Sequence, residues 1–283
     1  MPQPSESPVI LGFVSDLLFG VKIESTAARL GFEVRWIEHA DIVAPQDPLI
    51  PPRQPAEHLV GRGAALLDLL TRILPALIIF DLNNNDIPWR EWLPLVKSAP
   101  ATRRMPVLCF ASHVDVESIN YARSCGADEV LARSRFVEYL PQLIRKHARI
   151  IDIEAMLSAC REPLSGLALK GLEAFNRGDY FLSHEELELA WNQDSGPGRE
   201  LYRAILQVAV AYLQIVRGNY RGAMKMFLRV RQWIDPLPDE CRGVDVARLR
   251  SDAVQVHRAL ESLGPERIDQ FDRILLRPVH YTA

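Results

Sequence analysis

The segment GDYFLSHEELELAW, residues 178–191, combines residue types that can do chemistry at helical spacing. His184 and Glu188 are four residues apart and Trp191 follows three residues later, so the three side chains share one face of a helix. Apolar and aromatic residues flank this face, which predicts that the pair is buried. A buried carboxylate must be paired or protonated, because its desolvation is costly, and we expect His184 to pair with Glu188.

Three kinds of site fit this arrangement. Histidine and glutamate at this spacing can ligate one metal ion, with Glu173, Asp179 or Glu185 as further ligands. The pair, with Trp191 beside it, can also act in general acid–base catalysis in a pocket. The third alternative is structural: buried hydrogen bonds of the pair and Trp191 fix this helix against its neighbours.

The next predicted helix supplies a possible support for this pair. Leu201–Val216 is apolar on almost every side, which indicates a central core helix. Gln207 interrupts the apolar stretch and needs a hydrogen-bond partner if it is buried. We expect His184 or Glu188 to be that partner, so Gln207 is predicted to act from behind the site.

The start of the helix that carries the pair has two possible capping residues. Asp179 can cap it, and Ser183 with Glu186 also forms a capping box. The second choice places His184 in the first turn and weakens the shared face.

Acidic side chains also stand at the ends of two predicted strands in the first half. Asp16 follows the apolar run 9–14, and Asp81 ends the run 75–81. The carboxyl ends of parallel strands meet at one edge of the sheet, so the two carboxylates are expected to converge. Carboxylate oxygens suit Mg²⁺, and the sequence therefore predicts a magnesium site on Asp16 and Asp81.

Alternating strands and helices position these groups. Predicted strands occupy 9–14, 32–38, 75–81, 105–111 and 128–133, with helical patterns between them. This alternation indicates a parallel sheet with right-handed crossovers. After residue 150 only helical patterns remain, over 151–160, 165–177, 180–193, 199–217, 220–234, 244–262 and 265–274. The chain is therefore expected to hold an α/β domain followed by an all-α bundle.

The expected domain boundaries follow from these patterns and from the prolines. We predict a disordered N-terminus, an α/β domain with a proline-rich inserted loop, a linker with a helix, a helical domain and a tail. In the same order these are residues 1–8, 9–149 with its loop at 41–59, 150–164, 165–275 and 276–283.

Composition limits the class of protein. The chain has 283 residues, of which 48% are hydrophobic and 24% charged, with a net charge of -3. These values fit two globular domains and exclude a largely disordered chain or a generic polyanion binder. No signal peptide or membrane-spanning run is visible, so we expect a cytoplasmic protein without membrane contact.

The four cysteines carry no pairing or metal signal. Cys109, Cys125, Cys160 and Cys241 are widely and irregularly spaced, with no C-x-x-C pair. A zinc cluster or a disulfide framework is not expected, and we predict four reduced thiols.

The first half resembles the receiver domain of bacterial response regulators over about residues 8–148. The resemblance rests on the order of elements, on the apolar strand that ends in Asp81, and on the stretch GADEVLARS. It implies a flavodoxin-like, doubly wound fold in which Asp81 is the phosphoacceptor and Asp16 holds Mg²⁺. Ser112 and Arg133 then fall at or beside the positions that contact the phosphoryl group.

The match to the receiver pattern is partial. Ser15 stands where the family has its first acid, Ala111 takes the hydroxyl position, one residue before Ser112, and Arg133 replaces the lysine. Losing a carboxylate weakens the Mg²⁺ site, and exchanging lysine for arginine turns a point charge into a planar fork. These departures favour a pseudo-receiver that keeps the fold and uses it for docking or dimerisation.

The second half resembles the helical family called domain of unknown function 309. Its signature, His-x-x-x-Glu-x-x-Trp, is present in full as His184, Glu188 and Trp191. Gln207-Val208-Ala209, Gly218-Asn219 and Gly222-Ala223 agree with the family in order, and the match covers about residues 165–250. The resemblance implies a functional site at the signature without assigning its chemistry.

The leading hypothesis is a response-regulator-like signalling protein of a two-component phosphorelay, in which a degenerate receiver domain regulates a helical output domain. A histidine kinase or another signalling protein would be its partner, and a homodimer is compatible with it. No DNA-binding motif is evident. One alternative is a metal-assisted or acid–base hydrolase at His184 and Glu188, and another is a non-catalytic adaptor. Whether the chain is an enzyme stays open at this point.

Overall fold

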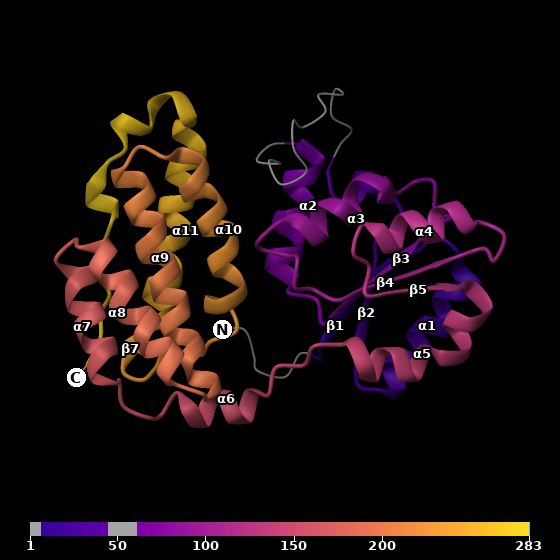
Figure 1. Cartoon of the computed structure of the whole chain (residues 1–283), viewed down its shortest axis with the longest axis horizontal. Helices are drawn as coiled ribbons and strands as arrows, with labels where there is room; N and C mark the ends of the chain where they lie inside the picture. Colours follow the sequence, from indigo (N-terminus) through magenta and orange to yellow (C-terminus); the bar gives the residue numbers. More distant parts are fainter. Residues whose placement is uncertain (1–6, 45–60, 283) are drawn as a thin grey trace. The chain divides into compact units, whose positions relative to one another are not determined.

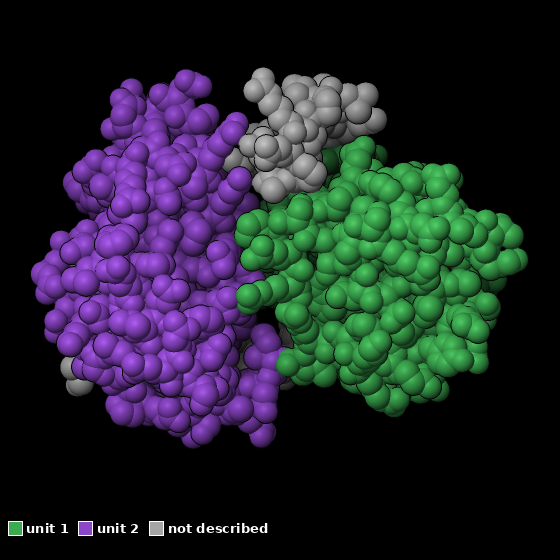
Figure 2. Space-filling view, in the orientation of Figure 1, with its two compact units in different colours: residues 1–150 green, residues 151–283 purple. Residues whose placement is uncertain are grey.

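The computed structural model describes residues 7–44 and 61–282. They belong to two compact units, residues 1–150 and 151–283 (Figures 1 and 2). Most of the predicted disordered segment 1–8 and of the proline-rich loop 41–59 lies outside the described residues. No helix in the described ranges is long and apolar enough to cross a membrane.

A five-stranded parallel sheet forms the centre of the first unit (Figure 1). The strands are β1 (Val9–Phe13), β2 (Glu33–Trp36), β3 (Leu77–Asp81), β4 (Val107–Ala111) and β5 (Glu129–Ala132). They lie in the order β2-β1-β3-β4-β5, which is the flavodoxin-like doubly wound order predicted from the sequence. Ligand sites of such sheets lie at the carboxyl ends of the strands, beside the point where the strand order reverses.

Helices cover both faces of the sheet. They are α1 (Leu17–Arg29), α2 (Gly61–Ile73), α3 (Trp89–Ser98), α4 (Val116–Ser124) and α5 (Arg133–His147). Helices α1 and α5 share one apolar core with alternate strand residues such as Leu77 and Ile79. Helices α2, α3 and α4 share the other core with Ile78 and Phe80. The alternation along β3 explains why its sequence is apolar throughout, since both faces are buried.

The second unit is built from helices. They are α6 (Ile153–Ala159), α7 (Gly166–Asn176), α8 (Tyr180–Gln193), α9 (Glu200–Val216), α10 (Tyr220–Ile234) and α11 (Val246–Leu263). Helix α9 packs against both α8 and α10, and ten of its residues are buried, as its apolar sequence predicts. The predicted helix at 265–274 consists of two short 3-10 segments, Pro265–Gln270 and Arg273–Leu275.

The helical prediction misses a hairpin between α10 and α11. Strands β6 (Glu240–Cys241) and β7 (Val244–Asp245) pair antiparallel, and Arg242 and Gly243 connect them with φ angles of 54° and 77°. Two positive φ angles are what a tight two-residue hairpin turn requires. The end of the chain joins this hairpin, because Tyr281 bridges to Val244. Two-residue strands are too short to show a strand period in sequence.

The prediction of four free thiols is wrong. Cys160 and Cys241 form a disulfide across 81 residues, while Cys109 and Cys125 are free. The error has a topological cause. The hairpin after α10 returns the chain to the end of α6, and neither the hairpin nor this return is visible in the spacing of the cysteines.

Candidate functional site

Three charged residues meet at the carboxyl edge of the parallel sheet. Asp16 follows β1 and is the N-cap of α1, Asp81 is the last residue of β3, and Arg133 is the first residue of α5, directly after β5. The strand order places β1 beside β3, which is why residues 65 positions apart in sequence converge here.

The Arg133 guanidinium binds both carboxylates. One of its terminal nitrogens donates to Asp16 Oδ2 at 2.6 Å and the other to Asp81 Oδ2 at 2.9 Å. The rings of Phe19 and Phe110 lie 5.0 and 5.5 Å from the guanidinium carbon. A planar fork suits this bridging contact, and aromatic faces attract the cation. The geometry fixes Arg133 between two acids and two rings.

The remaining oxygens of the two carboxylates are also bound. Asp16 Oδ1 accepts from the backbone N–H of Phe19 at 3.1 Å, which caps α1. Asp81 Oδ1 accepts from the backbone N–H of Asn83 at 3.0 Å. Both carboxylates are therefore held by the fold on both of their oxygens.

Burial separates the two acids electrostatically. The Asp81 side chain is 2% exposed, and this burial raises its pKa in spite of the Asn83 and Arg133 contacts. Asp16 is 37% exposed, and the Phe19 N–H, aided by Arg133, lowers its pKa. The buried carboxylate is thus the costlier of the two to keep ionised.

The residues at this edge do not fit the predicted magnesium site. A divalent cation takes six or more oxygen ligands, several from carboxylates or waters. Here the positive charge is already supplied by Arg133, Asp16 caps a helix, and Ser15 stands in place of a further acid. An ion held between the two carboxylates would compete with Arg133 for them.

An open groove of about 770 Å³ lies beside the cluster. Arg133, Ser112 and Asn83 line it together with Lys22 and His113. The side chain of Asn83 accepts from the backbone N–H of Ser112 at 2.8 Å, so it ties the loops after β3 and β4. The role of Ser112 as a phosphoryl contact stays a prediction.

Asn83 and the two rings were not identified as functional from the sequence. The sequence placed Asn83 just after a strand end, but its bond to Ser112 joins two loops 29 residues apart. From the sequence, Phe19 and Phe110 are indistinguishable from ordinary core residues. Apolar residues beside a charged strand end carry no signal of their own, and only the fold brings them against Arg133.

The signature of the second unit lies on α8, and Asp179 is its N-cap. Asp179 Oδ1 accepts from the backbone N–H of Leu182 at 3.1 Å, which decides between the two capping alternatives. Ser183 is buried inside the helix. Residues 184, 188 and 191 therefore lie along one face of the same helix, as expected.

The expected burial of the His–Glu pair is wrong. The His184 and Glu188 side chains are 33% and 52% exposed, and His184 Nε2 lies 4.0 Å from Glu188 Oε2. Of the two apolar residues expected to flank the pair, Leu187 is fully buried but Phe181 is half exposed, so apolar neighbours in sequence did not mark a buried face. The pair is a loose contact at the surface of the unit.

Trp191 makes the tightest contacts of the signature. The guanidinium carbons of Arg199 and Arg203 lie 4.5 and 4.8 Å from its ring, and Arg203 is also 3.6 Å from the ring of Trp233 on α10. Trp191 thus connects α8 to α9 through cation–π contacts. Its indole Nε1 is buried without a hydrogen-bond partner among the described residues.

Gln207 is buried as predicted, but its carbonyl oxygen has no hydrogen-bond partner in the described structure. The expected bond from His184 or Glu188 would need a donor at that oxygen, and Glu188 is an acceptor when ionised. Among the described residues no three His, Cys, Asp or Glu side chains are grouped to hold a metal ion.

One protein family matches the second unit. Residues 168–226 match the family described as domain of unknown function (DUF309). This segment runs from α7 into α10 and includes His184, Glu188, Trp191 and Gln207. A search of curated proteins finds no match to the chain.

Solved structures similar to the first half are response regulators. The phosphorylated cyanobacterial phytochrome response regulator RcpA is 16% identical, with 50% of this chain and 94% of that chain covered and a TM-score of 0.37. An orphan response regulator of H. pylori is 18% identical, covering 52% and 100%, with a TM-score of 0.36. The Mn²⁺-bound form of response regulator Rcp1 is 14% identical, covering 51% and 96%, with a TM-score of 0.36.

Proposed function

We propose that this chain is a signalling protein of the response-regulator type whose receiver-like unit works as a docking module without Mg²⁺-dependent phosphorylation. The helical unit is its output. The observation that carries the proposal is the Arg133 guanidinium bound to both Asp16 and Asp81.

Phosphoryl transfer to Asp81 is disfavoured by three features of the same cluster. The carboxylate is 2% exposed, so an incoming phosphoryl donor has little access to it. Both of its oxygens are bound, one by Asn83 and one by Arg133. Phosphoryl transfer also relies on a metal ion to neutralise developing charge, and the carboxylate that would hold it is paired with Arg133.

The same edge suits recognition by another protein. Loops that follow strands carry binding residues on a rigid scaffold. The groove beside Arg133 is lined by Lys22, His113 and Ser112, which offer positive charge and hydrogen bonds to an acidic partner segment. A histidine kinase or a related signalling protein fits this role, as does a second copy of the chain.

The first experiment tests the absence of phosphorylation. The full chain is incubated with Mg²⁺ and acetyl phosphate and its intact mass is read, with Asp81→Asn as the control and an active receiver domain treated in parallel. We expect the active receiver to gain a phosphoryl adduct and this chain to gain none. An adduct on the native chain that Asp81→Asn abolishes would overturn the proposal.

A second experiment tests regulation of the helical unit. Arg133→Ala opens the cluster, and hydrogen exchange of the full chain reports where protection changes. Faster exchange that extends into residues 151–283 is expected if the first unit controls the second. Changes confined to residues 1–150 would contradict an output role for the helical unit.

A further inference from the structure

The disulfide joins the first helix of the second unit to the hairpin that follows α10. Cys160 is the C-cap of α6, and Cys241 is the last residue of β6. Helix α6 begins three residues after the boundary between the units, so the chain leaves the first unit through this helix. The disulfide therefore anchors the first helix of the second unit, close to the start of that unit.

We propose that Cys160–Cys241 is a reversible thiol–disulfide exchange site for a dithiol reductant, and that its reduction loosens α6. Three observations support it: one of the two cysteines lines a pocket, non-covalent contacts also hold the joint between the end of α6 and the hairpin, and the rest of α6 is weakly anchored.

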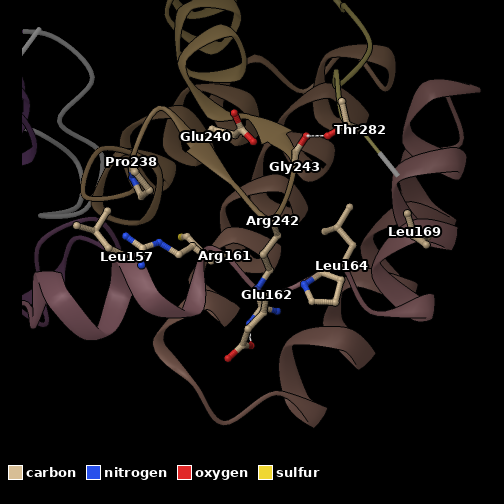
Figure 3. A pocket seen from close by; sticks show the side chains of 12 residues that line it. Leu157, Arg161, Glu162, Leu164, Leu169, Pro238, Glu240, Arg242, Gly243 and Thr282 are labelled. Atoms are coloured by element: carbon tan, nitrogen blue, oxygen red, sulfur yellow. Dashed lines mark hydrogen bonds and ion pairs between the residues drawn. The ribbon is translucent and has the colours of Figure 1, made fainter.

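Access to the bond is from the side of Cys160. This residue lines a pocket of about 630 Å³, together with Leu157, Arg161, Leu164 and Pro238 (Figure 3). Cys241 is fully buried and is not part of the pocket wall. Cys160 is itself only 7% exposed, so a reductant that enters the pocket meets Cys160 before Cys241 through a small exposed area. The lining carries both signs of charge, with Arg161 and Arg242 beside Glu162 and Glu240.

The exchange balances with a dithiol as the only co-reactant. One thiolate of the reductant attacks Sγ of Cys160, a new S–S bond forms, and the Cys160–Cys241 bond breaks. The leaving Cys241 thiolate takes up a proton. The second thiol of the reductant then attacks the reductant's first sulfur in the mixed disulfide, which closes the reductant's own disulfide and releases Cys160 as a thiol. Two electrons and two protons pass to the protein, and the reductant leaves as a disulfide.

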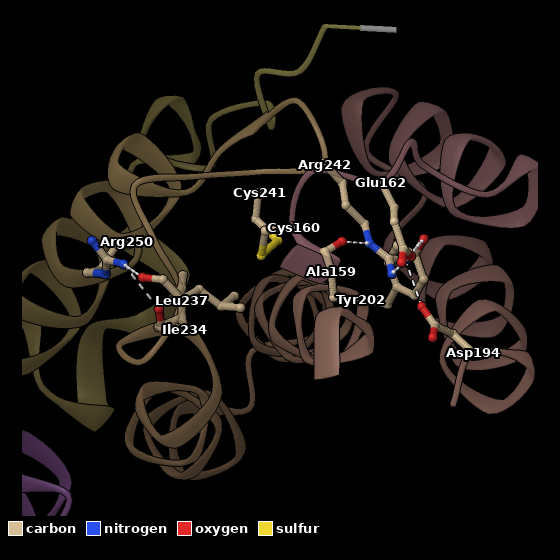
Figure 4. The surroundings of a disulfide bond; sticks show 10 residues. All are labelled: Ala159, Cys160, Glu162, Asp194, Tyr202, Ile234, Leu237, Cys241, Arg242 and Arg250. Atoms are coloured by element: carbon tan, nitrogen blue, oxygen red, sulfur yellow. Dashed lines mark hydrogen bonds and ion pairs between the residues drawn. A yellow bond between two sulfur atoms is a disulfide. The ribbon is translucent and has the colours of Figure 1, made fainter. Parts of the chain in front are cut away.

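Non-covalent contacts keep the joint assembled when the bond is broken. The backbone N–H of Arg242 donates to the Cys160 carbonyl at 2.6 Å, and Arg242 Nε donates to the Ala159 carbonyl at 3.2 Å (Figure 4). On the other side of the disulfide, Arg250 donates to the carbonyls of Ile234 and Leu237 at 3.2 and 2.8 Å (Figure 4). Reduction is therefore expected to leave the bundle folded.

Apart from the disulfide and the Arg242 contacts at its C-terminal end, helix α6 is weakly anchored. It is seven residues long, and only Met156 and Ala159 are buried along it. Ile153 and Leu157 remain 48% and 38% exposed. A helix this short is not stable alone in water, so its order depends on the packing of Met156 and Ala159 and on the contacts at its C-terminal end, of which the disulfide is the covalent one. Loss of the covalent bond should therefore act on α6 more than on the buried helix α9.

Thiol counting under native conditions tests the exchange. The oxidised full chain is treated with dithiothreitol or left untreated, freed of the reductant while still folded, then unfolded and alkylated, and its intact mass is read. The matched control is Cys109→Ser with Cys125→Ser, which keeps only the disulfide pair. We expect two alkylated cysteines before native reduction and four after it, and none and two in the control.

Two results would overturn the exchange site. Four alkylated cysteines in the native chain after mild oxidation would show that the bond does not form. A bond that dithiothreitol reduces only after denaturant is added would be a structural staple rather than an exchange site.

Hydrogen exchange of the full chain tests the effect on α6. Reduction is expected to speed exchange in residues 153–162 by about tenfold while α9 stays unchanged. Cys160→Ser with Cys241→Ser should reproduce this without a reductant. Equal exchange of α6 in the oxidised and reduced chains would overturn the proposed loosening, and unfolding of α9 would overturn the selectivity.

Discussion

Each unit of this chain contains an arginine that binds two acids and an aromatic ring, but the two arginines differ in exposure. Arg133 binds Asp16 and Asp81, and its side chain is 35% exposed at an open sheet edge. Arg242 binds Asp194 at 2.7 Å and Glu162 at 3.0 Å, lies over the ring of Tyr202, and is 4% exposed. The first unit thus uses a partly exposed arginine, and the second unit uses a buried one.

The difference shows what each arginine contributes. Arg242 connects the end of α6, the end of α8 and the hairpin, and its own side chain is almost fully buried at this junction. Its backbone φ of 54° is an unusual conformation for a residue with a side chain, and the surrounding contacts must hold it there. Arg133 instead neutralises two carboxylates and itself lines an open groove, where a partner can reach its guanidinium.

Removal of the buried arginine is expected to have the largest effect. Arg242→Ala should lower the free energy of unfolding of the second unit by about 3–5 kcal/mol, because it leaves Asp194 without its cation in a half-buried site. Hydrogen exchange of α9 in increasing urea measures this. Arg250→Ala, which removes a more exposed arginine of the same unit, is the control and should cost less. Equal losses would contradict the contrast in burial.

Removal of Arg133 should cost less than removal of Arg242. Arg133→Ala strands two carboxylates, but water screens the partly exposed Asp16, so we expect a loss of about 2–3 kcal/mol in the first unit. Hydrogen exchange of β3 in urea is the readout. Adding Asp81→Asn to this variant removes the buried charge and should recover much of the loss. If the double variant is no more stable than Arg133→Ala, the two side chains are not coupled.

The two carboxylates should respond to pH in opposite directions. Burial raises the pKa of Asp81, so the folded state holds this proton to higher pH than the unfolded chain, whose pKa is near 3.8. Its contribution to stability therefore falls as pH rises through the interval just above 3.8. The Phe19 N–H lowers the pKa of Asp16, so its contribution is present above 3.8 and is lost as pH falls below that value.

Asp81→Asn isolates the first of these slopes. The variant should gain stability relative to the native chain as pH rises above 3.8, because only the native chain must keep a buried carboxylate ionised. Urea unfolding of the first unit at several pH values measures the difference. A difference that is constant with pH would show that Asp81 titrates normally in the folded chain.

The sequence predicted contacts set by topology better than contacts set by burial. Parallel strands place their ends at one edge, so the convergence of Asp16 and Asp81 followed from the strand pattern, whereas the binding of both acids by Arg133 was not predicted. Helical spacing placed His184, Glu188 and Trp191 on one face, but spacing does not tell which face a neighbouring helix covers. The disulfide was beyond reach for a related reason, since pairing of Cys160 with Cys241 depends on a four-residue strand pair and on the path of α10.

The smallest effect is expected at the residues that the sequence singled out most strongly. His184→Ala and Glu188→Ala should each change the free energy of unfolding by less than about 1 kcal/mol, because an exposed pair at 4.0 Å contributes little. Trp191→Ala is the matched comparison and should cost more, since it removes the ring beneath Arg199 and Arg203.

The order of these three losses separates two roles within one helix face. A small loss for His184→Ala and Glu188→Ala beside a larger one for Trp191→Ala would make Trp191 the residue that holds α8 to α9. The His–Glu pair would then contribute little to stability and would be exposed for contact with a ligand or partner. A loss of several kcal/mol for His184→Ala would reverse this assignment, because it would show that the surface pair stabilises the bundle. Hydrogen exchange of α8 in urea reads all three variants on one scale.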